Sequence, residues 1–172
     1  KLKSAIFLFL GKCAAGIKRL AKFFYRHIVK NPIQSMLLLG IGVCLCWIYG
    51  RQIILVYGYR ASDIPVHMSW INEMSRGKIF AKGVYPFGFH CIIYYLHAVF
   101  RFDTYVILCQ FFFVQVIFMH LVLLAMLKQL CKTKYIPYIG TFVFLLGNFW
   151  SGQNYSRFYA TLPQEFGMIF VI

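Results

Sequence analysis

The residues best suited to chemistry lie in one short segment, YRASDIPVHMSWINEM, at residues 59–74. It holds Asp63 and, four residues later, His67, a spacing that places both side chains on one face of a helix. A carboxylate in such a position can accept a proton from a hydroxyl group, and the imidazole can orient it. Ser62 and Asp63 also precede Pro65, so capping the N–H groups of a helix is the alternative, structural role of Asp63.

The composition indicates a membrane protein. Of the 172 residues, 61% are hydrophobic and 13% are charged, against about 25% charged in ordinary soluble proteins. Basic residues outnumber acidic ones by 18 to 4. They are sorted along the chain as the positive-inside rule expects, which argues against nucleic acid as their partner. Eight precede the first long apolar run and three lie in KQLCKTK, residues 128–134, so both segments mark the predicted cytoplasmic side.

The six cysteines show no spacing typical of metal ligands. We interpret them as small hydrophobic side chains rather than disulfide partners or zinc ligands. The sequence therefore predicts no metal-binding residue and indicates no specific cofactor, although a divalent cation stays open.

The apolar segments predict an all-α fold, a polytopic transmembrane helical bundle with an outer loop of juxtamembrane helices. In chain order we expect a basic amphipathic cytoplasmic-face helix at 1–32, a first span at 33–57, an outer loop at 58–103, a second span at 104–127, a cytoplasmic loop at 128–134, a third span at 135–150, an outer loop at 151–165 and the start of a fourth span at 166–172. Because this last segment is too short to cross a bilayer, we expect the chain to be a fragment of a longer protein. A targeting peptide is the alternative for residues 1–30.

Residues 85–102, YPFGFHCIIYYLHAVFRF, decide the predicted topology. A span here would move the basic segment 128–134 to the outer side, against the charge rule. Their length suits a helix that lies along the membrane surface. We therefore expect two surface helices in the outer loop, one in 64–76 ended by Gly77 and one in about 87–101. This topology puts all four acidic residues on the outer side: Asp63, Glu73, Asp103 and Glu165.

The loop sequence SDIPVHMSWINEMSRGKIFAKGVYPFGFHCIIYYLHAVF resembles the first outer loop of GT-C-type polytopic membrane glycosyltransferases, which use polyprenyl-phosphate sugar donors. The similar part covers about residues 33–165. The resemblance implies that Asp63 is the general base and that His90, in the YPFGFH turn, lines the substrate site. Many members carry an acidic pair where Asp63 stands between Ser62 and Ile64, which leaves the role of a divalent cation open.

Three further residues are predicted to bind substrate. His67 lies one helical turn after Asp63, and Arg60 is one of several outer-loop basic residues suited to a phosphate group. Glu165 lies at the start of the fourth predicted span. It is either a polar contact of the site or a first-turn acid favoured by the helix dipole.

Together with the resemblance, these residues predict an integral-membrane glycosyltransferase of the bacterial plasma membrane and cell envelope, with a cytoplasmic N-terminus. It would move a sugar from a polyprenyl-phosphate donor to a glycan, lipid or protein acceptor at the outer face. The alternative is a non-enzymatic polytopic protein, such as a lipid-linked glycan flippase or a transporter; a polymerase of the O-antigen type shares the substrate class. A transporter would carry polar residues within its spans, where the clear candidates are Gln110, Gln115, His120 and Asn148.

Overall fold

The computed structural model describes residues 16, 18–19, 21–22, 25–26, 28–55, 58, 63–78, 88–151 and 157–171. In these residues the regular structure is entirely helical, without a strand, which confirms the predicted all-α class. The chain divides into two units, Lys1–Gly40 and Ile41–Ile172.

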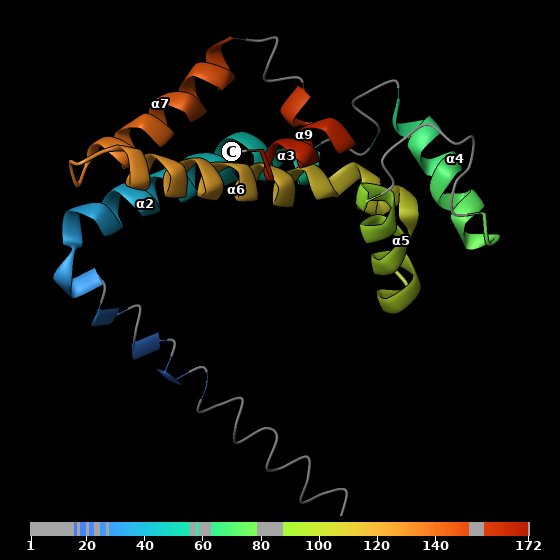
Figure 1. Cartoon of the computed structure of the whole chain (residues 1–172), viewed down its shortest axis with the longest axis horizontal. Coiled ribbons are helices and arrows are strands. Elements are labelled where there is room, and N and C mark those ends of the chain that lie inside the picture. The colour runs from blue at the N-terminus through green and yellow to red at the C-terminus, as the bar shows by residue number, and fades with distance from the viewer. Residues whose placement is uncertain are drawn as a thin grey trace, which may run out of the picture. The chain divides into compact units, whose positions relative to one another are not determined.

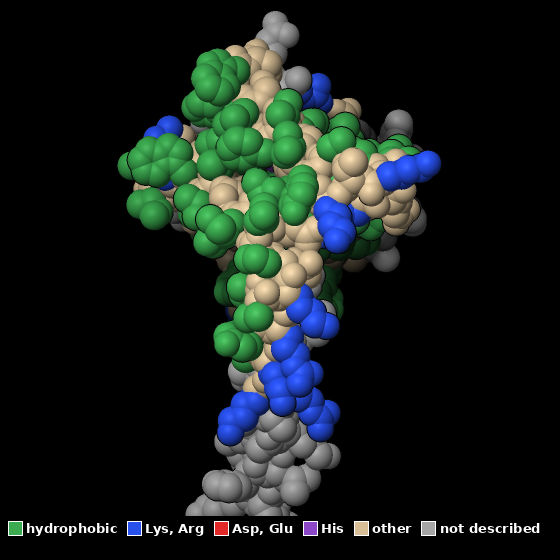
Figure 2. Space-filling view, turned by 90° about the vertical axis from the view of Figure 1, so that its left-hand side faces the viewer, with side chains coloured by type: hydrophobic (Ala, Val, Ile, Leu, Met, Phe, Trp, Pro, Cys, Tyr) green, Lys and Arg blue, Asp and Glu red, His purple; other side chains and the backbone are tan. Residues whose placement is uncertain are grey.

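The first unit is basic where it is described. Its described residues between 16 and 30 are helical, and five basic side chains among them are exposed: Lys18, Arg19, Lys22, Arg26 and Lys30. Figure 2 shows Lys and Arg side chains gathered along one narrow segment of the chain. Most of the predicted surface helix at 1–32 lies outside the described residues, and its membrane-surface position stays a prediction.

The first predicted span corresponds to a continuous helical stretch, Pro32–Leu55. It consists of α2 (Pro32–Leu45), the π-helical turn η1 (Cys46–Gly50) and α3 (Arg51–Leu55). Its 24 residues cover about 36 Å at about 1.5 Å per residue, more than the hydrocarbon core of about 30 Å. By length and composition this stretch can cross a membrane.

The second predicted span corresponds to α6 (Thr104–Leu130), which is also long and apolar enough to cross a membrane. Helix α7 (Ile136–Trp150) follows after residues 131–135 and packs back along α6, as Figure 1 shows. With 15 residues, or about 22 Å, α7 is shorter than the hydrocarbon core. The described residues thus hold two helices that support a membrane location, and the larger polytopic bundle stays a prediction.

The π-helical turn in the first candidate span is fixed by a residue from far along the chain. A π turn changes the hydrogen-bonding pattern of the helix, and side chains of neighbouring segments can satisfy the carbonyl groups that it frees. Here the Tyr159 hydroxyl donates to the Ile48 carbonyl oxygen at 2.7 Å. The fully buried Tyr49 ring lies against Tyr159, with 5.1 Å between ring centroids. These contacts anchor the segment before α9 to the first span.

Helices are present at both places predicted in the outer loop: α4 (Ile64–Ser75) and α5 (Gly88–Phe100). Gly77 follows α4 with a φ of +81°, a conformation that glycine adopts without a steric penalty. Helix α5 has 13 residues, or about 20 Å, which is too short to cross the bilayer by itself. Its length is therefore compatible with the predicted surface position.

The connection Arg101–Asp103 turns the chain sharply from α5 into α6. Arg101 has a φ of 57°, and its N–H donates to the His97 carbonyl oxygen at 2.9 Å. The His97 ring donates from Nδ1 to the Phe102 carbonyl oxygen at 2.7 Å. Asp103 Oδ1 caps α6 by accepting from two first-turn N–H groups, at 2.7 and 3.3 Å. This corner prevents α5 from continuing in line with α6.

An apolar cluster joins the helices on both sides of this corner. Its buried members come from α4, α5 and α6: Ile64, Ile71, Phe89, Ile93, Ile107 and Leu108. Leu162 and Phe166 add contacts from the short helix α9 (Pro163–Met168) and the residue before it. Helices α4 and α5 are thus packed on the N-terminal end of α6.

We predict that Arg101→Gly raises the thermal unfolding temperature of the detergent-solubilised protein. A non-glycine residue in the left-handed region costs about 1–2 kcal/mol, of which the entropy of an added glycine takes back about 0.5–1 kcal/mol. Arg101→Ala is the matched control, because it also removes the guanidinium but keeps the Cβ atom. Equal effects of the two substitutions would show that backbone conformation does not limit stability at this corner.

Candidate functional site

The histidines of the two outer-loop helices form a buried pair. His67 Nδ1 and His90 Nε2 lie 3.0 Å apart, joined by a hydrogen bond across 23 residues of sequence. His67 is 4% exposed and His90 is fully buried. The structure therefore brings together two residues that were predicted on separate grounds to bind substrate.

Helix periodicity and aromatic contacts position this histidine pair. His67 lies on the buried face of α4 with Ile64 and Ile71, and His90 lies in the first turn of α5. The Trp70 ring flanks both imidazoles, with centroid distances of 5.3 Å to His67 and 5.5 Å to His90. Sequence reasoning did not identify Trp70, although its position three residues after His67 places it on the same side of the helix.

Asp63 occupies the N-cap position of α4, but its side chain makes no capping hydrogen bond. Its main-chain oxygen accepts from the Val66 and His67 N–H groups at 3.0 and 3.1 Å. The side chain is exposed, and its negative charge opposes the lowering of the His67 pKa by burial. The predicted proximity of Asp63 and His67 is thus present, and the proposed capping role of the Asp63 carboxylate is not.

Burial controls the protonation of the histidine pair. Desolvation lowers the pKa of His67 below its ordinary value of 6.5, and the Asp63 charge offsets only part of this effect. Near pH 7 the His67 imidazole is therefore mostly neutral and able to accept a proton. The bond to His90 needs one donor and one acceptor nitrogen, so it survives the addition of one proton to the pair but not of two.

Glu165 lies apart from this hydrogen-bonded pair. Its Oε1 accepts from Arg157 Nε at 2.8 Å, and Arg157 Nη2 donates to Gln164 at 2.9 Å. The carboxylate is buried in the first turn of α9, where the helix dipole favours an acid. Among the described residues no hydrogen bond joins Glu165 to either histidine. Its contacts fit the alternative role given above, an acid in the first turn of a helix. Arg60 lies outside the described residues.

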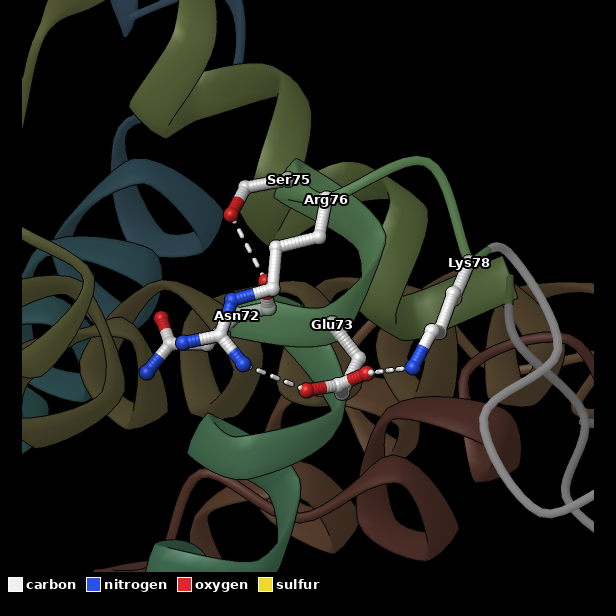
Figure 3. Close-up of polar contacts among 5 residues, drawn as sticks. All are labelled: Asn72, Glu73, Ser75, Arg76 and Lys78. Carbon is white, nitrogen blue, oxygen red and sulfur yellow. Dashed lines mark hydrogen bonds and ion pairs between the residues drawn. The ribbon is translucent and has the colours of Figure 1, made fainter.

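Glu73 forms ion pairs with two further basic residues at the end of α4. Arg76 and Lys78 lie 2.7 and 3.2 Å from its two carboxylate oxygens, at the end of α4 (Figure 3). The hydrogen bond and charge of Lys78, with those of Arg76, lower the pKa of Glu73. These cations are therefore engaged with a carboxylate of their own helix end.

No resident metal ion is indicated by the geometry of the described part. Its residues include no group of three or more His, Cys, Asp or Glu side chains placed to hold a metal. The cysteines described are free thiols: Cys44, Cys46, Cys91, Cys109 and Cys131. The arrangement of Asp63, His67 and His90 is suited to proton transfer.

We predict that acidification destabilises the protein through His67. The unfolded chain takes up a proton near pH 6.5, before the folded chain does, so stability is fully present above that pH and falls as the pH drops toward the lowered folded pKa. His67→Gln should reduce the loss of thermal stability between pH 7.5 and pH 5. Asp63→Asn should enlarge it, because the carboxylate that favours the charged imidazole is gone. A reduced loss in Asp63→Asn would contradict this assignment.

Comparison with known proteins found no match for this chain. No protein-family model, no curated protein and no solved structure matches the chain. The function must therefore be argued from the residues and contacts described above.

Proposed function

We propose that the protein is an integral-membrane glycosyltransferase that uses a polyprenyl-phosphate sugar donor at the outer membrane face, with Asp63 as the general base. The observation that carries the proposal is the hydrogen bond between His67 and His90. It joins the helix that begins at Asp63 to the YPFGFH segment, the two parts of the outer loop on which the resemblance rests.

The proposed reaction is a direct displacement at the sugar. Asp63 takes the proton of an acceptor hydroxyl while that oxygen forms a bond to the anomeric carbon. The bond from this carbon to the phosphate oxygen breaks, and the polyprenyl phosphate leaves with the electron pair. The bonds formed and broken and the transferred proton balance in this step without a cofactor. A base placed within hydrogen-bond reach contributes about 100-fold to 10,000-fold to such a step.

The histidine pair is proposed to position and tune the base. Asp63 is exposed, so an acceptor can reach its carboxylate from the solvent side. Bound substrate must exclude water from this carboxylate during transfer, because a carboxylate surrounded by water is a weak base. The neutral His67 next to it adds no positive charge that would lower its basicity, and His90 fixes the orientation of that imidazole.

The decisive test is Asp63→Asn in the full-length protein. We expect a loss of sugar transfer of about 100-fold or more at unchanged membrane expression, because the amide cannot accept the proton. Transfer is measured in membranes with radiolabelled polyprenyl-phosphate hexoses. Glu73→Gln is the matched control, an acid of the same helix whose partners are Arg76 and Lys78. Wild-type transfer by Asp63→Asn would remove the mechanism.

One observation favours the alternative, a lipid-linked glycan flippase or transporter. Three of the polar residues predicted within the spans are buried, with 3% of Gln115, 2% of His120 and 7% of Asn148 exposed. His120 Nδ1 donates to Val116 of its own helix, and its ring lies 5.5 Å from the Phe144 ring of α7. Buried polar groups in a membrane mark substrate pathways in transporters.

These buried groups allow the two functions to be separated. Within the described residues, Gln115 Oε1 and Asn148 Nδ2 have no hydrogen-bond partner. Replacing such a group by an apolar one of similar shape is close to neutral or stabilising. We therefore expect Gln115→Leu and Asn148→Leu to leave both thermal stability and hexose transfer at or above wild-type values. Loss of lipid-linked sugar translocation in vesicles by these variants, without any transfer activity in the wild type, would establish the alternative.

A further inference from the structure

An open pocket of about 170 Å³ lies between α4, α5 and the start of α6. Its lining side chains come from all three helices and from the cap of α6: Met68, Ile71, Asn72, Ser75, His97, Asp103 and Thr104. Neither His67 nor His90 is among them. The pocket is therefore a separate feature of the outer-loop helices, adjacent to the candidate site on α4.

The pocket has an apolar base and a polar rim. Met68, Ile71, Asn72 and Ser75 follow one another at helical spacing, so they form one side of α4. Ile71 is almost completely buried, whereas Asn72 and Ser75 are exposed. A ligand in this pocket would meet carbon atoms at the base and hydrogen-bonding groups around them.

The rim offers both acceptors and donors. His97 Nδ1 must carry a proton, because its partner is the Phe102 carbonyl oxygen, so Nε2 of the neutral ring is an acceptor. Asp103 uses Oδ1 for the cap of α6. The Ser75 hydroxyl donates to the Asn72 carbonyl oxygen at 2.6 Å and keeps its lone pairs. Thr104 adds a hydroxyl group that can donate and accept.

The charge around the pocket argues against an anionic ligand. No Lys or Arg is among the described residues that line it. The cations at the end of α4, Arg76 and Lys78, are bound to Glu73, as Figure 3 shows. The positive end of the α6 dipole and two N–H groups offset part of the Asp103 charge. An uncharged ligand with several hydroxyl groups suits this balance better than a phosphate.

We propose that this pocket binds one ring of a neutral sugar, with its C–H face on Met68 and Ile71 and its hydroxyl groups on the polar rim. The pocket is smaller than the about 300–1,000 Å³ typical of sites for drug-sized ligands, which suits a single ring. The inference rests on the proposed function, because it names a neutral hexose as part of the substrate of the same outer-loop helices.

The test measures binding of methyl hexosides to the full-length protein in detergent, by saturation-transfer NMR with the methyl glycosides of glucose, galactose and mannose. We expect saturable binding of at least one, weakened at least tenfold by Asn72→Ala and by Asp103→Ser. Serine preserves the N-cap of α6 and removes the carboxylate, so this variant keeps the fold. Glu73→Gln, on the same helix but not among the described lining residues, is the control and should bind as the wild type does.

Each other outcome overturns the inference or separates it from the proposed function. Binding that is lost in Glu73→Gln and kept in the pocket variants would place the sugar elsewhere. Displacement of the glycoside by ethanolamine, or no saturable binding of any methyl hexoside, would also overturn the inference. Binding with the expected variant pattern in a protein that shows no hexose transfer would support the pocket and remove the glycosyltransferase.

Discussion

The corner between α5 and α6 is the constraint on which the rest of the outer-loop structure depends. Asp103 caps α6, and Arg101 takes a left-handed conformation that ends α5. Without this corner the apolar residues of α5 and α6 would be free to form one long helix, and His90 would move away from α4. The hydrogen bond between His67 and His90, the aromatic contacts of Trp70 and the pocket all require α5 to lie against α4.

The buried histidine pair has an energetic logic of its own. Burial of a polar group without a hydrogen bond costs about 1–3 kcal/mol by mutational measures, so two imidazoles in an apolar cluster are expected to bond to each other. That mutual bond makes each ring the orienting partner of the other. Structure and site are therefore coupled here, because the contact that stabilises the packing of α4 on α5 also fixes the imidazole beside Asp63.

Local signals in the sequence predicted the helices. They did not predict the contacts between residues that are far apart in the chain. Pro65 and Gly77 mark the two ends of α4 because their backbone preferences act within one or two residues. The approach of His67 to His90 depends instead on how α4 packs on α5. The spacing of residues along one helix does not determine that packing. The π-helical turn was missed for the same reason, since the Tyr159 hydroxyl that satisfies Ile48 comes from 111 residues away in sequence.

The four acidic residues differ in the groups that their carboxylates act on. Glu73 binds two cations at the end of α4, Asp103 caps α6, and Glu165 binds Arg157. Asp63 differs, because its side chain does not cap the helix that it precedes and its charge acts on an imidazole instead. The resemblance implied that Asp63 is the base, and this role stays a proposal. The contacts of Glu73, Asp103 and Glu165 instead belong to the ends of α4, α6 and α9, because each of these carboxylates binds cations or N–H groups there.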